Sequence, residues 1–570
     1  MKQFAICRLV LKLLAIGLLA ITARGGELTG INLTTLSEFN PDNGEQPNDS
    51  LVLASDGNLY GTTIAGGTNG VGVVFKVNAN AGLTVLHYFS TNTWDGAYSY
   101  APLIVGPNNN LYGTTAYGGV YGQGTIFEIT TNGLFTQLYS FGSEINDLDY
   151  ALDGSIPRAA LTLGSDGNYY GVTDNGGTAN EGTVFQFSTN GILTTLHSFA
   201  GNGNNDDGLY PLFAPLVEGT KGVFYGTTYS GGTNNDGTVF RVTAGGAFTT
   251  LFEFDGTNGL NPYAGLTFGT DGKLYGTTSG GGTYQDGNVF QITTNGILTT
   301  LVEFNGTNGL LPYAGVILGL DNSLYGTTYE GGLGFGPGST GNGTVYQLTT
   351  NGSLTTIFSF YQGDDGTFPI GGVIRGANGY WYGTTAYGGS QNCGAVYSLN
   401  DTIAPTLAIT SPEAGQQMTN AVATFTGTAG DNLGCSGVWY QLNGGPWNLV
   451  KTLNSYTNWT ITAPLIAGTN LFSAYAVDFS DDFSGTNSVS VVSSNTFKLQ
   501  LDFTAAQPLT GNGLSFNLQI SPGLSGQIQI STNLADWTIL TNFTGTGTNI
   551  QLNDETATHY NQRFYRAVIP

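Results

Sequence analysis

The chain has 570 residues, of which 40% are hydrophobic, 12% aromatic and 9% charged. Its 14 Lys and Arg residues against 38 Asp and Glu residues give a net charge of −24, which disfavours nucleic acid and anionic membrane surfaces, because both need clustered basic side chains. The composition also excludes a highly charged disordered polymer. The 89 glycines, with frequent Thr, Asn, Tyr and Phe, are typical of short strands joined by tight turns, so we expect an all-β fold.

Residues 1–25 have the pattern of a secretory signal peptide. A basic segment ends at Lys12, and the apolar stretch Leu13–Ala23 that follows is too short to span a bilayer. Small residues at Ala23 and Gly25 fit a cleavage site. An uncleaved membrane anchor is the alternative, but it would have to bury Lys12. We therefore predict a secreted or cell-surface bacterial protein with no transmembrane segment after cleavage.

A tetrapeptide, Tyr-Gly-(Thr/Val)-Thr, recurs seven times, and subtraction of its positions gives steps of 50 to 58 residues. Such a period indicates repeated units that bury their apolar faces against each other. Each unit contains four strand-like runs with Asp-Gly or Asn-Gly turns between alternating residues, which predicts an antiparallel meander. We expect the tetrapeptide to build the fold and not to form a repeated ligand site. The seven copies begin at Tyr60, Tyr112, Tyr170, Tyr225, Tyr275, Tyr325 and Tyr382.

The two ends of the repeat region are permuted. Leu33–Phe39 has the pattern of a fourth run but precedes all the others, whereas Ala395–Asn400 is a third run with no fourth run after it. The N-terminal run can therefore complete the last sheet and remove two exposed edges. This predicts a seven-bladed β-propeller over residues 31–401. An open solenoid would not need the permuted ends and would carry atypical capping repeats.

The stretch "DGKLYGTTSGGGTYQDGNVFQITTNGILTTL" resembles the GloVer-type tandem repeat of secreted, choice-of-anchor proteins, and the likeness extends over all seven units. The resemblance implies export or surface attachment with variable C-terminal modules. It supplies no catalytic residues.

The long connections of the repeats lie on one face and are the candidate binding surface, because binding residues concentrate in variable loops on rigid scaffolds. Aromatic side chains beside carboxylates suit a neutral polysaccharide, whose apolar sugar faces stack on rings. The alternative is that the tyrosines only cover glycine-rich loops. The predicted ligand-binding residues are Trp94, Asp95, Tyr117, Tyr121, Tyr229, Tyr284, Tyr329, Tyr387, Asp206, Asp207, Asp364 and Asp365. The same connections also carry Tyr98, Tyr150, Tyr210, Tyr263 and Tyr313.

Two functions remain open. The leading one is an exported, non-catalytic binding or adhesion protein, monomeric, with a polysaccharide or a surface protein as partner. The second is a secreted glycan-cleaving enzyme, a glycoside hydrolase or lyase that uses loop carboxylates about 5–10 Å apart. We assign no catalytic residue, because sequence does not show whether carboxylates of different repeats converge.

No cofactor and no metal site is expected. Asp147, Asp149 and Asp153 are a weak calcium candidate, since their spacing departs from the EF-hand pattern. His87 and His197 occupy the same strand position in different repeats, so they do not suggest a zinc site or a catalytic triad.

Two further β domains follow the repeats. Residues 403–495 have the strand spacing of a β-sandwich, and "DNLGCSGVWYQLNGGPW" within them resembles bacterial immunoglobulin-like modules, which implies a spacer or weak binder. Residues 496–570 predict a small β domain for sorting and attachment, or an accessory domain. Cys393 and Cys435 could form a disulfide in an oxidising compartment unless they lie too far apart.

Overall fold

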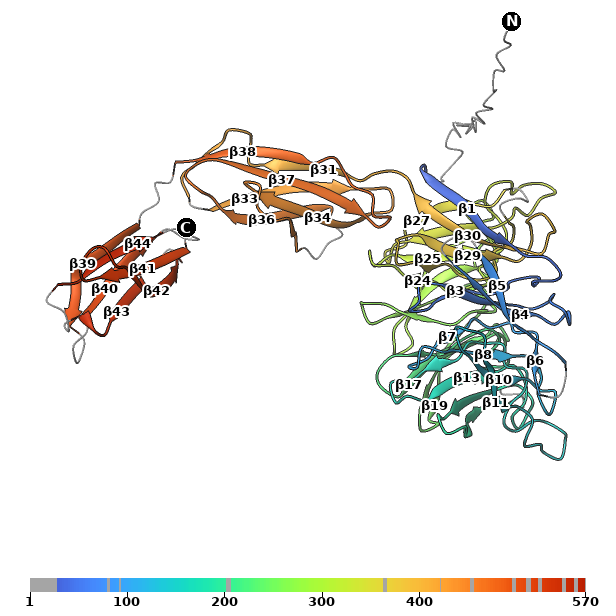
Figure 1. Ribbon diagram of the computed structural model, residues 1–570. Helices are drawn as coiled ribbons and strands as arrows, with labels where there is room; N and C mark the ends of the chain where they lie inside the picture. The colour runs from blue at the N-terminus through green and yellow to red at the C-terminus, as the bar shows by residue number, and fades with distance from the viewer. Residues whose placement is uncertain are drawn as a thin grey trace, which may run out of the picture.

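The computed structural model describes residues 28–78, 82–91, 94–200, 207–361, 366–420, 422–451, 456–494, 499–508, 514–520, 525–545, 550–557 and 562–568. The predicted signal peptide, residues 1–25, lies outside them, as do Asp206, Asp364 and Asp365. The described chain consists of strands and connections without an α-helix, which confirms the all-β prediction (Figure 1). None of its segments is a helix long and apolar enough to cross a membrane.

Residues 31–401 form seven four-stranded antiparallel sheets within the described chain. Sheet 1 contains β2(Val52–Leu53), β3(Leu59–Thr63), β4(Val73–Val77) and β5(Leu83–Tyr88). Sheet 2 contains β7(Ile104–Val105), β8(Leu111–Thr115), β10(Thr125–Ile129) and β11(Phe135–Ser140). Sheet 3 contains β12(Thr162–Leu163), β13(Tyr169–Thr173), β14(Thr183–Phe187) and β15(Leu193–Ser198). Sheet 4 contains β16(Val217–Glu218), β17(Val223–Thr228), β18(Thr238–Thr243) and β19(Phe248–Glu253).

The remaining sheets continue in the same order. Sheet 5 contains β20(Thr267–Phe268), β21(Leu274–Thr278), β22(Asn288–Ile292) and β23(Leu298–Glu303). Sheet 6 contains β24(Ile317–Leu318), β25(Leu324–Thr328), β26(Thr344–Leu348) and β27(Leu354–Ser359). Sheet 7 contains β28(Ile374–Arg375), β29(Trp381–Thr385), β30(Ala395–Asp401) and β1(Ile31–Glu38). A short ribbon, β6(Gly96–Ala97) with β9(Tyr117–Gly118), joins two loops of sheets 1 and 2.

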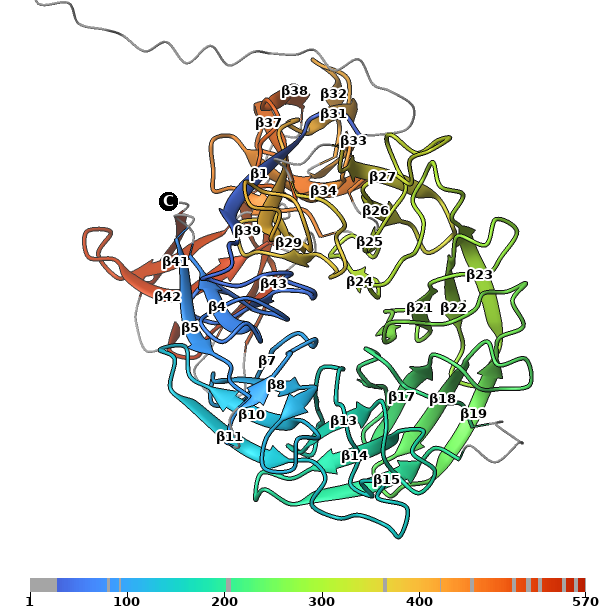
Figure 2. The ribbon, with the colours of Figure 1, turned by 90° about the vertical axis from the view of Figure 1, so that its right-hand side faces the viewer.

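The N-terminal strand completes the last sheet. β1 pairs antiparallel with β30, with Ile31 opposite Asp401 and Glu38 opposite Ala395. This agrees with the permuted order of the runs in the sequence. Figure 2 shows the seven sheets following one another around a circle, with β1 beside β29 at the top.

The repeated Tyr-Gly-Thr-Thr lies in the second strand of each sheet, and its tyrosine hydroxyl and its glycine make contacts within that sheet. In sheet 5 the Tyr275 hydroxyl donates a hydrogen bond to Asp271 of the preceding turn at 2.9 Å. A Cβ atom at Gly276 would lie 2.6 Å from the ring of Phe290, so glycine is required for the close approach of that ring.

The first threonine of the tetrapeptide joins neighbouring sheets. The Thr277 hydroxyl donates to the Ala314 carbonyl of sheet 6 at 3.0 Å. Val172 replaces this threonine in sheet 3 and has no hydroxyl to donate. The equivalent bonds run from Thr62 to Ser99 and Ala101, from Thr114 to Ala159, from Thr227 to Ala264, from Thr327 to Gly371 and from Thr384 to Asp49.

A second joint repeats seven times between sheets. In sheet 5, Asn261 has a positive φ of 51° and its N–H donates to the Asp236 carbonyl of sheet 4 at 2.8 Å. Pro262, which follows it, packs so closely on Gly237 that a Cβ atom there would lie 2.6 Å from the proline ring. The equivalent donors and acceptors are Tyr98 to Val71, Ile156 to Gln123, Tyr210 to Glu181, Leu311 to Asp286, Phe368 to Asn342 and Gln46 to Cys393. The last of these links sheet 1 to sheet 7.

The cores of the repeat region lie between adjacent sheets and not within one central cluster. Between sheets 5 and 6, for example, Tyr275 and Phe304 pack with Val316, Leu324 and Tyr346. Replacing such a buried aromatic with alanine costs about 3–5 kcal/mol. Each sheet is therefore stabilised mainly by its two neighbours.

An immunoglobulin-like sandwich follows. One sheet has the order β31-β33-β36 and the other β32-β38-β37-β34-β35. Trp459, Phe425 and Phe472 form its core, whereas Trp447 is 36% exposed and packs on Tyr475. The strands are β31(Thr406–Ser411), β32(Gln417–Met418), β33(Val422–Gly430), β34(Cys435–Leu442), β35(Asn448–Leu449), β36(Asn458–Pro464), β37(Gly468–Asp478) and β38(Asn487–Ser493).

The C-terminal part contains two three-stranded sheets, β39-β40-β43 and β42-β41-β44. Its strands are β39(Leu499–Pro508), β40(Leu514–Ile520), β41(Ser525–Ser531), β42(Thr538–Thr544), β43(Ile550–Asp554) and β44(Phe564–Val568). Elsewhere, Cys393 and Cys435 are both buried and free, so they do not form the disulfide that the sequence left open.

Candidate functional site

The second joint between sheets, the proline joint, carries a proline in six of the seven sheets and places one residue of each sheet near the centre of the circle. Two residues after the positive-φ position comes a residue that lies four positions before the innermost strand, and in five of the seven sheets it lines a cavity shared with other sheets. Sheet 4 has one extra residue, so Phe213 takes the place of the second residue. The seven axial residues are Asn48, Tyr100, Arg158, Phe213, Tyr263, Tyr313 and Ile370.

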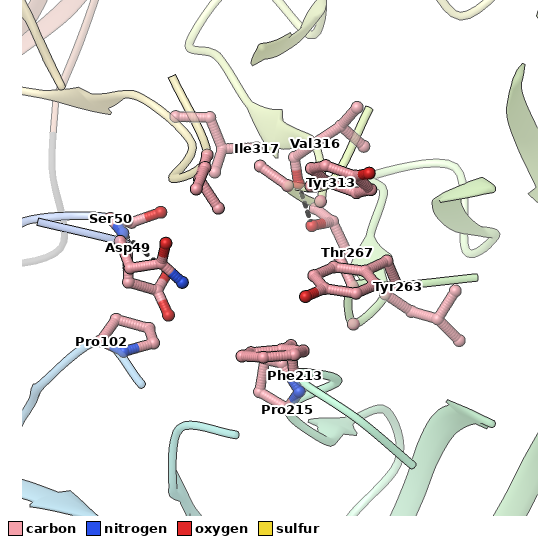
Figure 3. A pocket seen from close by; sticks show the side chains of 17 residues that line it. Asp49, Ser50, Pro102, Phe213, Pro215, Tyr263, Thr267, Tyr313, Val316 and Ile317 are labelled. Atoms are coloured by element: carbon pink, nitrogen blue, oxygen red, sulfur yellow. Dashed lines mark hydrogen bonds between the residues drawn. The ribbon is translucent and has the colours of Figure 1, made fainter. Parts of the chain in front are cut away.

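A cavity of about 190 Å³ lies among these side chains. Figure 3 shows Asp49, Ser50 and Pro102 on one side of it, with Tyr263 and Phe213 on the other. Residues separated by more than 200 positions in the sequence thus line one space, because the sheets they belong to face each other across the circle.

A second cavity of about 450 Å³ adjoins the first and shares Asn48, Ile370, Tyr263 and Tyr313 with it. Its other polar lining consists of hydroxyl and amide groups and no carboxylate; these come from Tyr229, Asn261, Ser279, Gln285 and Tyr329. Together the cavities offer rings and neutral hydrogen-bonding groups.

The rings form a continuous series that we call the aromatic arc: Tyr100, Phe213, Tyr263, Tyr313, Tyr329, Phe368 and Tyr387. Successive ring centroids lie 5.8, 4.6, 4.7, 5.2, 5.0 and 6.0 Å apart in that order. These spacings are those of stacked or edge-to-face contacts. Burial raises the pKa of both Tyr263 and Tyr313, so their hydroxyls stay protonated at neutral pH and can donate hydrogen bonds.

One cation stands within the arc. The Arg158 guanidinium lies 5.0 Å from the centre of the Tyr100 ring and 5.8 Å from that of Phe213, and it forms an ion pair of 2.9 Å with Asp174. Burial raises the pKa of Asp174 to about 7, although Arg158 acts in the opposite direction. The pair fixes the position of the arginine between two rings.

Asp49 is the acidic residue in the lining of the smaller cavity. Its carboxylate accepts the backbone N–H of Ser50 at 2.7 Å, and its carbonyl accepts the Thr384 hydroxyl at 2.9 Å. Desolvation raises the pKa of Asp49 well above its usual value.

Four of the predicted ligand-binding residues lie at this site. Tyr329 and Tyr387 belong to the aromatic arc, and Tyr229 lines the larger cavity. Tyr117 lies beside Arg158, whose guanidinium nitrogen is 3.5 Å from its hydroxyl. Gln46 donates a hydrogen bond to the Tyr387 hydroxyl at 3.2 Å, so sheet 1 also contributes to this face.

Two predicted carboxylates are occupied elsewhere. Asp95 and Asp207 lie 3.2 and 3.1 Å from the imidazoles of His87 and His197, respectively. These histidines sit on β5 and β15, the outermost strands of their sheets in Figure 2, and each stacks on a phenylalanine of the next sheet. The two pairs therefore connect sheets at the outer edge.

Three other predicted residues stand apart from the arc. Trp94, Tyr121 and Tyr284 are 75%, 52% and 57% exposed and belong to neither cavity lining. Asp206, Asp364 and Asp365 lie outside the described residues.

The weak calcium candidate has a structural role. Asp153 accepts the backbone N–H groups of Gly142 and Ser143, each at 3.0 Å, and the Tyr139 hydroxyl at 2.8 Å. Asp147 and Asp149 are exposed, and among the described residues the three acids do not bring their oxygens together.

Sequence reasoning missed Asp49, Arg158, Asp174, Phe213 and Phe368. The available signal was the proline that precedes the innermost strand in six of the seven units. Aligning the repeats on this proline, and not on Tyr-Gly-Thr-Thr, places Arg158, Tyr263 and Tyr313 in one column.

Comparison with known families identifies two parts of the chain. A family model described as the Gloeobacter/Verrucomicrobia repeat matches residues 22–151 and 145–336, and one described as a bacterial Ig domain matches residues 405–474. No curated protein matches the chain.

Solved structures overlap with it at low identity. A proposed 6-phosphogluconolactonase from Bacteroides uniformis is 14% identical with a TM-score of 0.38, and the match covers 57% of this chain and 88% of the other. The endo-arabinase of Bacteroides thetaiotaomicron is 12% identical with a TM-score of 0.25, covering 55% and 95%. The family models therefore carry the identification, and these overlaps add nothing to it.

Proposed function

The chain belongs to the Gloeobacter/Verrucomicrobia repeat family, and from that premise we propose that its seven sheets are the blades of a closed β-propeller in an exported, non-catalytic binding or adhesion protein. The pairing of β1 with β30 and the hydrogen bond from Gln46 to Cys393 support closure. The immunoglobulin-like sandwich and the C-terminal β domain act as spacers that hold the propeller away from the cell.

We propose a neutral polysaccharide as the ligand. The aromatic arc is the observation that carries this proposal, since flat rings stack on the apolar faces of sugars. Asn48, Asn261 and Gln285 lie beside the rings. Their amide groups can both donate hydrogen bonds to sugar hydroxyls and accept hydrogen bonds from them. A charged ligand is less suited to the larger cavity, whose polar lining is neutral.

Asp49 supports the second candidate, a glycan-cleaving enzyme. Its pKa is raised by desolvation, and a carboxyl group with a raised pKa can serve as a general acid. Glycoside cleavage needs a second carboxylate, and Asp174, whose pKa is also raised by burial, is held in an ion pair with Arg158. Binding without cleavage is therefore the function that the geometry supports best.

The test is a polysaccharide array on which retained protein and released reducing sugar are measured in the same wells. We expect retention without release, and we expect Tyr313→Ala to weaken retention about ten- to a hundredfold, as removal of a central aromatic contact does. Tyr284→Ala is the matched control, because Tyr284 is exposed and lies outside both cavities.

Release of sugar that Asp49→Asn abolishes would establish the enzyme instead. Equal retention of Tyr313→Ala and wild type would show that the arc is not the binding site. Absence of retention on every glycan would leave a surface protein as the partner and contradict the polysaccharide proposal.

A further inference from the structure

The joint between the last sheet and the immunoglobulin-like sandwich is built from specific contacts. Asn432 donates to the Thr29 carbonyl at 3.0 Å and to Asp401 at 3.1 Å. Leu433 is buried in the cluster that contains Trp381. The Arg375 guanidinium lies 4.6 Å from the Phe479 ring centre and donates to the Phe479 carbonyl.

Three carboxylates meet at this joint. Asp401 ends β30, Asp431 lies between β33 and β34, and Asp478 ends β37. One oxygen of each lies within 4.8 Å of the others. Asp401 and Asp478 are 3% and 1% exposed, so two of the three groups are almost fully removed from water.

Each carboxylate has one oxygen held by protein N–H groups. Asp401 accepts the backbone N–H of Ile403 at 3.0 Å, Asp431 accepts that of Leu433 at 2.9 Å, and Asp478 accepts those of Ser480 and Asp482 at 2.7 and 2.9 Å. These bonds fix the orientation of all three side chains.

The other oxygen of each carboxylate is buried without a hydrogen-bond partner among the described residues: Asp401 Oδ2, Asp431 Oδ1 and Asp478 Oδ2. No Lys or Arg of the described chain forms an ion pair with these acids. Buried unpaired carboxylates are costly, and native proteins compensate them with a counter-charge, a hydrogen bond or a metal ion. Burial, with repulsion from neighbouring acids, raises the pKa of Asp431 and Asp478 to about 6.

We propose that Asp401, Asp431 and Asp478 bind a calcium ion that locks the sandwich onto the last sheet of the repeat region. Calcium takes carboxylate oxygens at about 2.3–2.6 Å, so two oxygens bound to one ion stand at most about 5 Å apart, and the three oxygens here lie within 4.8 Å of one another. Magnesium keeps several of its waters and is usually bound through one or two carboxylates, so a site with three carboxylates favours calcium. Water completes the coordination shell.

The ligands come from two parts of the chain, so binding of the ion affects how these parts are held together. Asp401 belongs to sheet 7, whereas Asp431 and Asp478 belong to the sandwich. A bound ion therefore joins the two, and its loss leaves three like charges that push them apart. The proposal is independent of the polysaccharide site.

The test uses the full chain after treatment with a chelator, titrated with calcium chloride in a calorimeter. We expect one ion per chain with a dissociation constant of about 10⁻⁴–10⁻³ M, as in extracellular calcium modules, and weaker binding of magnesium. Asp431→Asn should weaken calcium binding at least tenfold. Asp147→Asn, an exposed acid of the loop that the sequence also suggested for calcium, should leave it unchanged.

Thermal unfolding provides a second readout, because calcium should reverse which of wild type and Asp431→Asn unfolds at the higher temperature. Without calcium, Asp431→Asn should unfold at the same temperature as wild type or higher, because it removes one of three repelling charges. With calcium, wild type should unfold at the higher temperature. Absence of calcium binding up to about 10 mM, or equal binding by wild type and Asp431→Asn, would overturn the proposal.

Discussion

At the residue scale, the residues that recur in every repeat and the residues that line the candidate site lie at different positions of the repeat. The residues of Tyr-Gly-Thr-Thr are committed to hydrogen bonds and packing, as Tyr275, Gly276 and Thr277 show. The side chain that follows the proline varies between units: Tyr263 lines both cavities, whereas Arg158 lies against the Tyr100 ring. The side chains of the candidate site are thus the ones that differ from unit to unit.

Asp49 gives a pH-dependent prediction at this scale. Because its pKa is raised in the folded state, the folded protein holds a proton that the unfolded chain has already lost, so stability falls as pH rises from about 4. Asp49→Asn removes this loss. Urea unfolding should therefore show equal stability of variant and wild type near pH 4 and a more stable variant near pH 8.

Asp56→Asn is the control with the opposite sign. The Asp56 pKa is lowered, since hydrogen bonds from Tyr60 and Asn58 outweigh its desolvation, so its ionised form stabilises the folded state. This variant should lose stability relative to wild type as pH rises from about 2 to 5. A wild type that is as stable as Asp49→Asn at pH 8 would show that Asp49 is not desolvated.

At the element scale, the sheets depend on each other through the proline joint. Gly287 has a φ of +89°, and a Cβ atom there would collide with the Thr278 carbonyl oxygen and the Pro312 ring of the next sheet. Gly272 has a similar φ of +79° in a turn, but nothing lies within 4 Å of its Cβ position. Comparing the two glycines separates the cost of the backbone conformation from the cost of the steric collision.

We predict that Gly287→Ala destabilises the chain well beyond Gly272→Ala. Both variants have an unfavourable φ that costs about 1–2 kcal/mol, whereas only Gly287→Ala must also displace Thr278 of its own sheet and Pro312 of the next. Chemical denaturation of the two variants measures the difference. Equal loss of stability would mean that the joint has room and does not hold the sheets together.

The sequence predicted the elements better than the site. Tight-turn signals and the permuted runs were sufficient to predict four strands per unit and the pairing of β1 with β30. The site required knowing which residues of different units converge, and Asp49 and Tyr263 approach each other only through the circular arrangement. Asp95 and Asp207 appeared available in the loops, but His87 and His197 on neighbouring strands pair with them.

At the scale of the whole molecule, the circular arrangement of the sheets lets similar repeats contribute different side chains to one shared surface. The seven units place different side chains around one centre, and the aromatic arc combines rings from five of the sheets. The three carboxylates at the joint with the sandwich likewise combine residues from two domains. In both places the chemistry arises between units and not within one.

Hydrogen exchange of the whole protein, with and without an oligosaccharide retained on the array, tests the central claim most directly. We predict that the ligand protects the axial segments at residues 261–266, 311–316 and 366–373, because they form the walls of the cavities. Exchange near Trp94 and Tyr284 should not change. Protection confined to those outer loops or to the immunoglobulin-like sandwich, with the axial segments unaffected, would contradict the account.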